Sequence, residues 1–340
     1  MQPIRGKTRR TTTLILEADR SGPLGKTLRG SSRLDVHASH DPARALARIR
    51  RTPPGVVAVH LDDFGQAGIL FVEELMRAAP VPIVVWSRLS PRGAELAARA
   101  LSLGAADVVG FTESADGWET RLVAASRADT TRLRSPAPPK ALHAPIPPGN
   151  SPWKLIALVG GIGATEALRA LLPQLPLEAA PVLAITHHSP ELLKAFAASV
   201  GRDYVMEMRN WTAGEKLDRG KIHLAGARDP FGVERRGSFC YASPLERGEG
   251  LPIDRMLQSV AYTFGRGCIA VALTGAGTDG AKGLACIRAQ GGHTIAQAPE
   301  TAAHPALSMA AAKLDTAAEI ENLEDIPLAI RALFGRRVAA

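Results

Sequence analysis

The chain has 340 residues, of which 46% are hydrophobic and 22% are charged, and its formal net charge is +8. This composition excludes a mostly disordered or fibrous protein, and the length corresponds to about two domains. Three cysteines are too few for a disulfide-built fold or a four-cysteine zinc site. The apolar runs are shorter than the ~20 residues of a membrane span and than the core of a secretory signal. We therefore expect a cytoplasmic protein without membrane insertion.

The positive charge is concentrated in the first half of the chain. Residues 1–150 carry a net charge of +7 and residues 151–340 carry +1, and four basic residues lie within residues 1–10. Nucleic-acid-binding surfaces usually combine clustered basic residues with aromatic side chains, and only 4% of this chain is aromatic. We interpret residues 1–10 as a solvated basic tail and do not expect nucleic-acid binding.

Residues 11–130 alternate between strand and helix patterns. Asp41 and Ser90 are each followed by proline, which is typical of a helix N-cap and first helical position. The expected strands lie at residues 12–17, 55–61, 81–87 and from 107, and the expected helices at 42–51, 69–79 and 90–104. Strands separated by helices predict a parallel sheet with helices on both faces.

A linker is expected at residues 131–152, because seven prolines fall between Pro136 and Pro152. Proline-rich segments favour extended geometry and act as semi-rigid spacers. A second domain should therefore begin at residue 153 and extend to about residue 336.

The second domain repeats the alternation, which predicts a doubly wound α/β fold. The expected strands lie at residues 155–159, 181–186, 268–274 and 293–297, and the expected helices at 165–172, 189–200 and 281–290. Active sites of such sheets lie at the carboxyl ends of the strands. This rule selects three loops: Gly160–Ala164, His187-His188 and Gly275–Gly280.

The first of these loops, GGIGATEA, follows a strand and opens a helix, as a phosphate-binding turn does. A dinucleotide fingerprint starting at Gly161 would place Glu166 where a small residue is needed, and its carboxylate would repel pyrophosphate. A P-loop would need a GK[ST] sequence, which is absent. We therefore expect no nucleotide cofactor.

The other two loops contain candidate acid–base residues. Neighbouring side chains at a strand end point to opposite faces, so His187 and His188 are not expected to share a metal, and we expect no metal site. Asp279 could accept a hydrogen bond from a histidine on a neighbouring strand end and fix its tautomer. It could equally cap the helix that begins at Ala281, and the local pattern leaves both interpretations open.

The second domain resembles the catalytic domain of the CheB family of chemotaxis protein-glutamate methylesterases. ITHHSP is similar to the family's ITQHMP, and this implies that His188 is the catalytic base. LTGAGTDGAKGL is similar to LTGMGNDGAAGM, and this implies that Asp279 completes the triad. GEKLDRGKIHLA and GGHTIAQ also match family segments, in family order. The resemblance covers residues 153–334 approximately.

Residues 11–129 resemble a response-regulator receiver, which implies a flavodoxin-like parallel sheet. Ser87 falls at the hydroxyl switch position, and Asp19 matches one of the two acidic pocket residues, whose partner is Ala18 here. The ungapped alignment places His60 at the phospho-acceptor position, and Asp62 would occupy it only with a two-residue gap. The expected lysine is replaced by Phe111. We therefore expect a domain that is not phosphorylated, with no confident acceptor.

The nucleophile of the resembled family is also missing. The family's IGASTGG-x-EAL aligns with LVGGIGATEAL, which places Gly161 at the serine position. No serine or cysteine lies between Leu155 and Leu168, and the nearest hydroxyl, on Thr165, is expected on the helix.

Two functions follow from this resemblance. The first is a pseudo-enzyme that binds methyl-accepting chemoreceptors or the chemosensory kinase complex, with lost or weak esterase activity. The second is an active methylesterase and glutamine deamidase, in which His188 and Asp279 activate water directly. A smaller possibility is unrelated binding, including nucleotide or nucleic acid through the basic tail.

Overall fold

A computed structural model describes residues 10–19, 23–111, 113–133, 154–204, 206–228, 230–246 and 248–335. The chain divides into two compact units, residues 1–130 and residues 131–340. Most of the expected basic tail and most of the expected linker lie outside the described residues.

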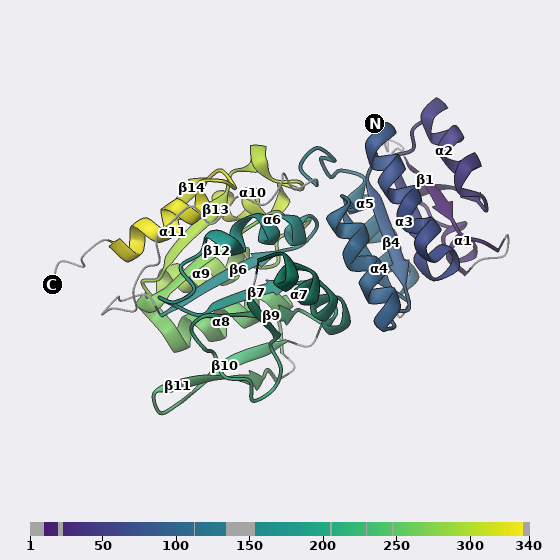
Figure 1. The fold of residues 1–340 in the computed structure, drawn as a ribbon. Coiled ribbons are helices and arrows are strands. Elements are labelled where there is room, and N and C mark those ends of the chain that lie inside the picture. Colours follow the sequence, from purple (N-terminus) through teal and green to yellow (C-terminus); the bar gives the residue numbers. More distant parts are fainter. Residues whose placement is uncertain are drawn as a thin grey trace, which may run out of the picture. The chain divides into compact units, whose positions relative to one another are not determined.

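The first unit contains a five-stranded parallel sheet with the strand order β2-β1-β3-β4-β5 (Figure 1). Its strands are β1 (Thr11–Leu16), β2 (Leu34–Ser39), β3 (Val56–His60), β4 (Ile83–Ser87) and β5 (Asp107–Gly110). This order is that of flavodoxin-like folds, in which ligands bind at the carboxyl ends of the strands. The prediction of a receiver-like parallel sheet is confirmed.

Helices cross over between the strands of this unit. They are α1 (Pro23–Leu28), α2 (Pro42–Arg51), α3 (Leu61–Ala78), α4 (Pro91–Ser102) and α5 (Ala115–Ala125). The expected N-caps are confirmed, since Asp41 accepts a hydrogen bond from the Arg44 amide and Ser90 accepts one from the Gly93 amide. The elements α1, β2 and α5 were not predicted from the sequence.

The second unit contains a seven-stranded parallel sheet with the order β14-β13-β12-β6-β7-β9-β8. Its strands are β6 (Leu155–Gly160), β7 (Val182–Thr186), β8 (Glu207–Asn210), β9 (Lys221–Gly226), β12 (Cys268–Ala272), β13 (His293–Gln297) and β14 (Glu319–Glu321). β6 comes first in the chain and pairs with β7 on one side and β12 on the other. The strand order therefore reverses between β6 and β12, and the doubly wound prediction is confirmed.

Helices cover this sheet, and a separate antiparallel hairpin packs beside it (Figure 1). The α-helices are α6 (Ala164–Leu171), α7 (Pro190–Tyr204), α8 (Pro252–Phe264), α9 (Ala281–Ala289), α10 (Ala306–Lys313) and α11 (Ile326–Gly335). The 3-10 helices are η1 (Leu172–Gln174), η2 (Gly265–Gly267) and η3 (Pro299–Thr301), and the hairpin consists of β10 (Phe231–Arg236) and β11 (Phe239–Pro244). Alternate residues of β6 and β12 enter two different apolar clusters, so this sheet is buried on both faces.

Candidate functional site

A candidate site lies at the switch point of the second sheet, where the loops after β6, β7 and β12 meet (Figure 1). These loops carry Gly161, His187 and Asp279. Gly161 donates its amide hydrogen to the carbonyl of Thr274, at 2.9 Å, which ties the first loop to the third. Because parallel strands end at the same edge, residues more than a hundred positions apart come together here.

The backbone at Gly161 can hold a side chain. A Cβ atom there would lie 3.4 Å from Cα of Gly275, 3.6 Å from the nitrogen of Ala276 and 3.8 Å from Cδ2 of His187, all ordinary contacts. Its φ lies outside the left-handed region. By contrast, a Cβ on Gly160 would lie 2.7 Å from the Cβ of Ala164. Steric fit therefore explains the glycine at 160 but not the glycine at 161.

His187 is the histidine that lies beside Asp279. Its Nε2 is 3.5 Å from Oδ2 of Asp279, and its side chain is 40% exposed. His188 is buried, and its Nδ1 lies 3.2 Å from Oγ1 of Thr186. The structure thus brings together position 161, His187 and Asp279, while the family-position histidine faces Thr186.

Asp279 has an unusual environment for a carboxylate. Burial raises its pKa to about 6, and the neighbouring Asp254 carboxylate acts in the same direction, although backbone amides of residues 253 and 254 oppose the shift. Asp254 donates its amide hydrogen to Oδ1 of Asp279 at 3.0 Å. Asp254 was not singled out from the sequence, because nothing in LPIDRM links it to a loop 25 residues away.

Three threonines lie near position 161 in the loops of the site: Thr165 and Thr274 are buried, whereas Thr278, directly before Asp279, is exposed. Thr165 is 2% exposed and lies in the first turn of α6. Thr274 donates its hydroxyl hydrogen to the carbonyl of Ile162 and accepts one from the amide of His304, each at 2.8 Å. Thr274 therefore links two loops by hydrogen bonds, and Thr165 is buried in a helix. Neither stands at position 161, where the family's serine is expected.

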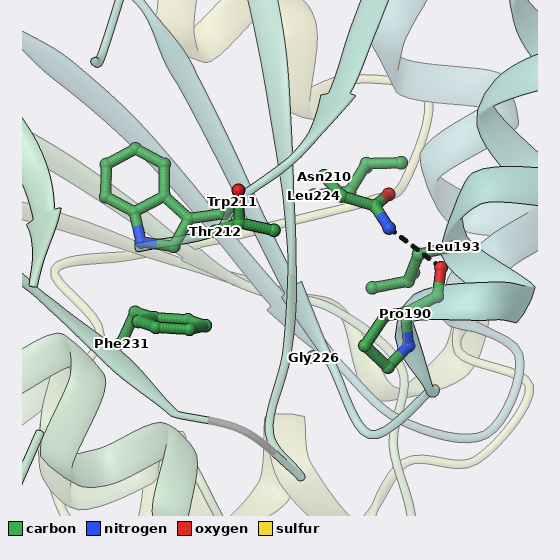
Figure 2. Close-up of a pocket in the computed structure, with 8 residues that line it drawn as sticks. All are labelled: Pro190, Leu193, Asn210, Trp211, Thr212, Leu224, Gly226 and Phe231. Carbon is green, nitrogen blue, oxygen red and sulfur yellow. Dashed lines mark hydrogen bonds between the residues drawn. The ribbon is translucent and has the colours of Figure 1, made fainter. Parts of the chain in front are cut away.

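A cavity of about 250 Å³ lies on the β7–β9 side of the cleft (Figure 2). Asn210 donates its side-chain N–H to the carbonyl of Pro190 at 2.8 Å. Figure 2 shows Trp211 and Phe231 on one side of the β9 segment and Asn210 with Pro190 on the other. The full lining consists of Pro190, Leu193, Asn210, Trp211, Thr212, Leu224, Gly226 and Phe231. The cavity is mainly apolar and adjoins the histidine segment through Pro190.

The corresponding edge of the first unit holds a cluster of charged side chains. His60 ends β3, and its Nδ1 lies 2.6 Å from Oδ2 of Asp63 while its Nε2 lies 3.6 Å from Oδ2 of Asp62. Ser87 donates its hydroxyl hydrogen to Asp62 at 3.1 Å, and the Arg88 amide donates to the same carboxylate at 2.7 Å. Ser87, His60 and Asp62 are therefore neighbours, as the receiver resemblance implies for its pocket positions.

Aromatic rings pack against this cluster. The His60 and Trp86 rings are stacked with centroids 3.9 Å apart, and Trp86 stacks on Phe111 at 4.6 Å. Asp19 is exposed, while burial raises the pKa of Glu17. A receiver uses such a pocket to hold Mg²⁺ between carboxylates. These residues do not fit the ion, because His60 and backbone amides already engage Asp62 and Asp63.

The part of the chain that the structure describes holds neither a metal-binding cluster nor a membrane-spanning helix. Within those ranges, no group of three or more histidine, cysteine, aspartate or glutamate residues is arranged to hold a metal ion. No helix in the same ranges is both long and apolar enough to cross a membrane.

Known proteins resemble this chain along most of its length. Residues 156–330 match the family model of the CheB methylesterase. A Bordetella avium protein named protein-glutamate methylesterase/protein-glutamine glutaminase 2 is 35% identical over 280 residues, which cover 77% of this chain and 79% of that protein. A Pseudomonas aeruginosa protein of the same name is 31% identical over 305 residues, which cover 85% and 86% of the two chains.

Among solved structures, the CheB methylesterase catalytic domain of Thermotoga maritima matches at 23% identity with a TM-score of 0.48, covering 53% of this chain and 98% of that one. The response regulator domain of the same organism's CheB matches at 19% identity with a TM-score of 0.32, covering 36% and 99%. The family-model match and the extent of the curated relatives show that this chain belongs to the CheB methylesterase family.

Proposed function

We propose that this chain acts in chemosensory signalling as a binding protein that keeps the methylesterase cleft without its nucleophile. The observation that carries the proposal is Gly161, which stands where the family's serine is expected and where a Cβ atom would make only ordinary contacts. A triad hydrolase needs a hydroxyl or thiol to form its acyl-enzyme, and loss of that group costs about a million-fold in turnover.

The partners that we propose are methyl-accepting chemoreceptors or the chemosensory kinase complex. Support comes from family membership and from the names of the relatives, which are methylesterases and glutaminases. His187 lies beside position 161 and pairs with Asp279, so these loops offer polar groups to a glutamyl ester or glutamine side chain. Such a protein would occupy or shield a methylation site without hydrolysing it.

We propose also that the receiver-like unit is not phosphorylated. His60 stands at the aligned acceptor position, and the carboxylate of Asp62 is engaged by Ser87, by the Arg88 amide and, more distantly, by His60. Phosphoryl transfer to an aspartate depends on a metal ion that neutralises charge, and this pocket does not suit one.

An active methylesterase is the second candidate, and the His187–Asp279 pair favours it. In that reaction the imidazole would take a proton from water, and the hydroxide would attack the glutamyl ester carbonyl. Methoxide would then leave with the proton of the imidazolium, as methanol, and the glutamic acid formed would release its remaining proton to solvent to give the carboxylate. This route lacks covalent catalysis and would be slow.

Methanol release from a methylated chemoreceptor fragment tests the choice. We expect no release above background from the natural chain or from Gly161→Ala, and release at least about a hundredfold above background from Gly161→Ser. The alanine variant is the matched control, because it adds the same Cβ without a hydroxyl. Enzymatic turnover by the natural chain would refute the binding proposal.

Calorimetric titration of the natural chain with the same fragment tests the other half of the proposal. We expect saturable binding, weakened when Asp279 is replaced by alanine. A chain that neither binds nor hydrolyses the fragment would exclude the receptor methylation region as its partner.

A further inference from the structure

Asp254 and Asp279 each accept hydrogen bonds at the N-terminus of the other's helix. Asp254 belongs to α8 and caps α9, while Asp279 directly precedes α9 and accepts from the first turn of α8. Helix α9 begins after Gly280, which has no side chain to cap it, and its N-terminal amides are instead satisfied from α8. Oδ1 of Asp254 accepts hydrogen bonds from the amides of Gly280 and Gly283, each at 2.8 Å. Helix α8 has Leu251 at its N-cap position, with no side-chain cap, and Oδ1 of Asp279 accepts from the Asp254 amide in its first turn.

This exchange settles what each oxygen of Asp279 does. The sequence left open whether Asp279 caps the helix that follows it or orients a histidine. Asp254 provides the cap of α9, so Asp279 is released from that role, and its Oδ1 faces α8 while its Oδ2 faces Nε2 of His187. A capping hydrogen bond stabilises the end of the helix, and it also fixes the direction of the carboxylate that makes it.

The two helices are also packed too closely to shift independently. A Cβ on Gly283 would lie 2.6 Å from the Cβ of Leu257, so α8 and α9 approach each other at a position that only glycine allows. Asp254 itself is 9% exposed, and a buried carboxylate is retained in a fold only where hydrogen bonds satisfy it. The two caps and the close helix packing therefore tie the loop that carries Asp279 to both helices.

We infer that Asp254 is a positioning residue, which holds the loop at Gly275–Gly280 and thereby aims Asp279 at His187. Asp254 is buried, and its role is carried out through Asp279. The inference rests on the proposed function only in taking the same cleft as the functional one.

The test is an NMR titration of the His187 imidazole in the full chain, with its signal assigned by the His187→Gln variant. An ionised carboxylate a few ångströms away favours the charged imidazole, so we expect Asp279→Asn to lower the His187 midpoint by about one pH unit. Asp254→Ala should lower it to within a few tenths of the Asp279→Asn value, although Asp279 is still present. Asp254→Asn, which keeps an acceptor oxygen, should stay close to the natural chain.

The double variant Asp254→Ala with Asp279→Asn should show no shift beyond Asp279→Asn alone, because Asp254 acts through Asp279. Should Asp254→Ala fail to fold, Asp254→Ser carries the same expectation, since it retains only one short acceptor in the first turn of α8. A folded Asp254→Ala or Asp254→Ser chain with an unchanged His187 midpoint would overturn the inference and leave Asp254 as a helix cap only. The readout needs no substrate, so it stands apart from the outcome of the methanol assay.

Discussion

In the receiver-like unit, the His60 imidazole and the rings of Trp86 and Phe111 pack together at the carboxyl edge of the sheet, whereas in the methylesterase domain a Cβ atom at position 161 would make only ordinary contacts with its neighbours. Both sites lack a group that the family resemblance leads us to expect. In the first, His60 makes contacts of its own with Asp62, Asp63 and the aromatic rings. In the second, we propose that the nucleophile's side chain is absent while His187 and Asp279 are kept beside one another.

This difference determines whether a substitution can restore the chemistry of each site. The carboxylates near His60 are bound to that histidine, to Ser87 and to backbone amides, so one substitution cannot recreate a metal pocket. The cleft at Gly161 still has a histidine and a carboxylate in place. We therefore expect a single substitution to restore chemistry in the second site and to cause only damage in the first.

The largest expected effect concerns which imidazole serves a restored nucleophile. In a Gly161→Ser chain, we expect His187→Gln to lower methanol release about a hundredfold, to background, because His187 lies beside both position 161 and Asp279. His188→Gln should cost less than tenfold, since His188 is buried against Thr186. The reverse ranking would return the base to the position that the family motif implies.

The next effect concerns the filled site. Replacing His60 by Asp would place a third carboxylate beside Asp62 and Asp63 and remove their shared partner. We expect it to destabilise the receiver-like unit by about 3 kcal/mol, measured by urea unfolding, with no phosphoryl uptake from acetyl phosphate and Mg²⁺. His60→Gln, which adds no charge, is the matched control and should cost about half as much. Phosphoryl uptake by His60→Asp would show that the site had remained open.

A smaller effect separates two adjacent glycines. Gly160→Ala forces a Cβ to within 2.7 Å of the Ala164 Cβ and 3.0 Å of the Thr274 carbonyl oxygen, so we expect a loss of about 2 kcal/mol. Gly161→Ala should change the free energy of unfolding by less than about 0.5 kcal/mol. Equal losses at the two positions would mean that packing also requires Gly161. Position 161 would then have no room for a side chain.

The fold and the site were predictable from the sequence to different extents. Buried parallel strands such as β3, β4, β6 and β12 are continuous apolar runs bounded by helix caps, and these local signals identified them. Strand β8 (EMRN) is a short edge strand with polar residues, and it carries no such signal.

At the site, the sequence identified the loops but not the contacts between them. His187 and His188 are adjacent, and which one faces Asp279 depends on how β7 ends and on the approach of the loop after β12. The role of Asp254 depends on two helices meeting at their N-termini, which is a tertiary relation without a local pattern.

The smallest effect we expect is a pH dependence of stability that is caused by Asp279. The pKa of Asp279 is raised from 3.8 to about 6 by burial, so the folded chain holds this proton more tightly than the unfolded chain does. Between pH 4 and pH 6 the folded state therefore loses stability as pH rises, and above pH 6 the loss is complete.

Asp279→Asn removes this titration and keeps an acceptor for the Asp254 amide. Relative to the natural chain it should gain on the order of 1–2 kcal/mol between pH 4 and pH 7, measured by urea unfolding at each pH. Parallel stability curves for the two proteins would mean that Asp279 titrates as an ordinary solvated carboxylate, and the cleft would then be wetter and less organised than its contacts with His187 and Asp254 indicate.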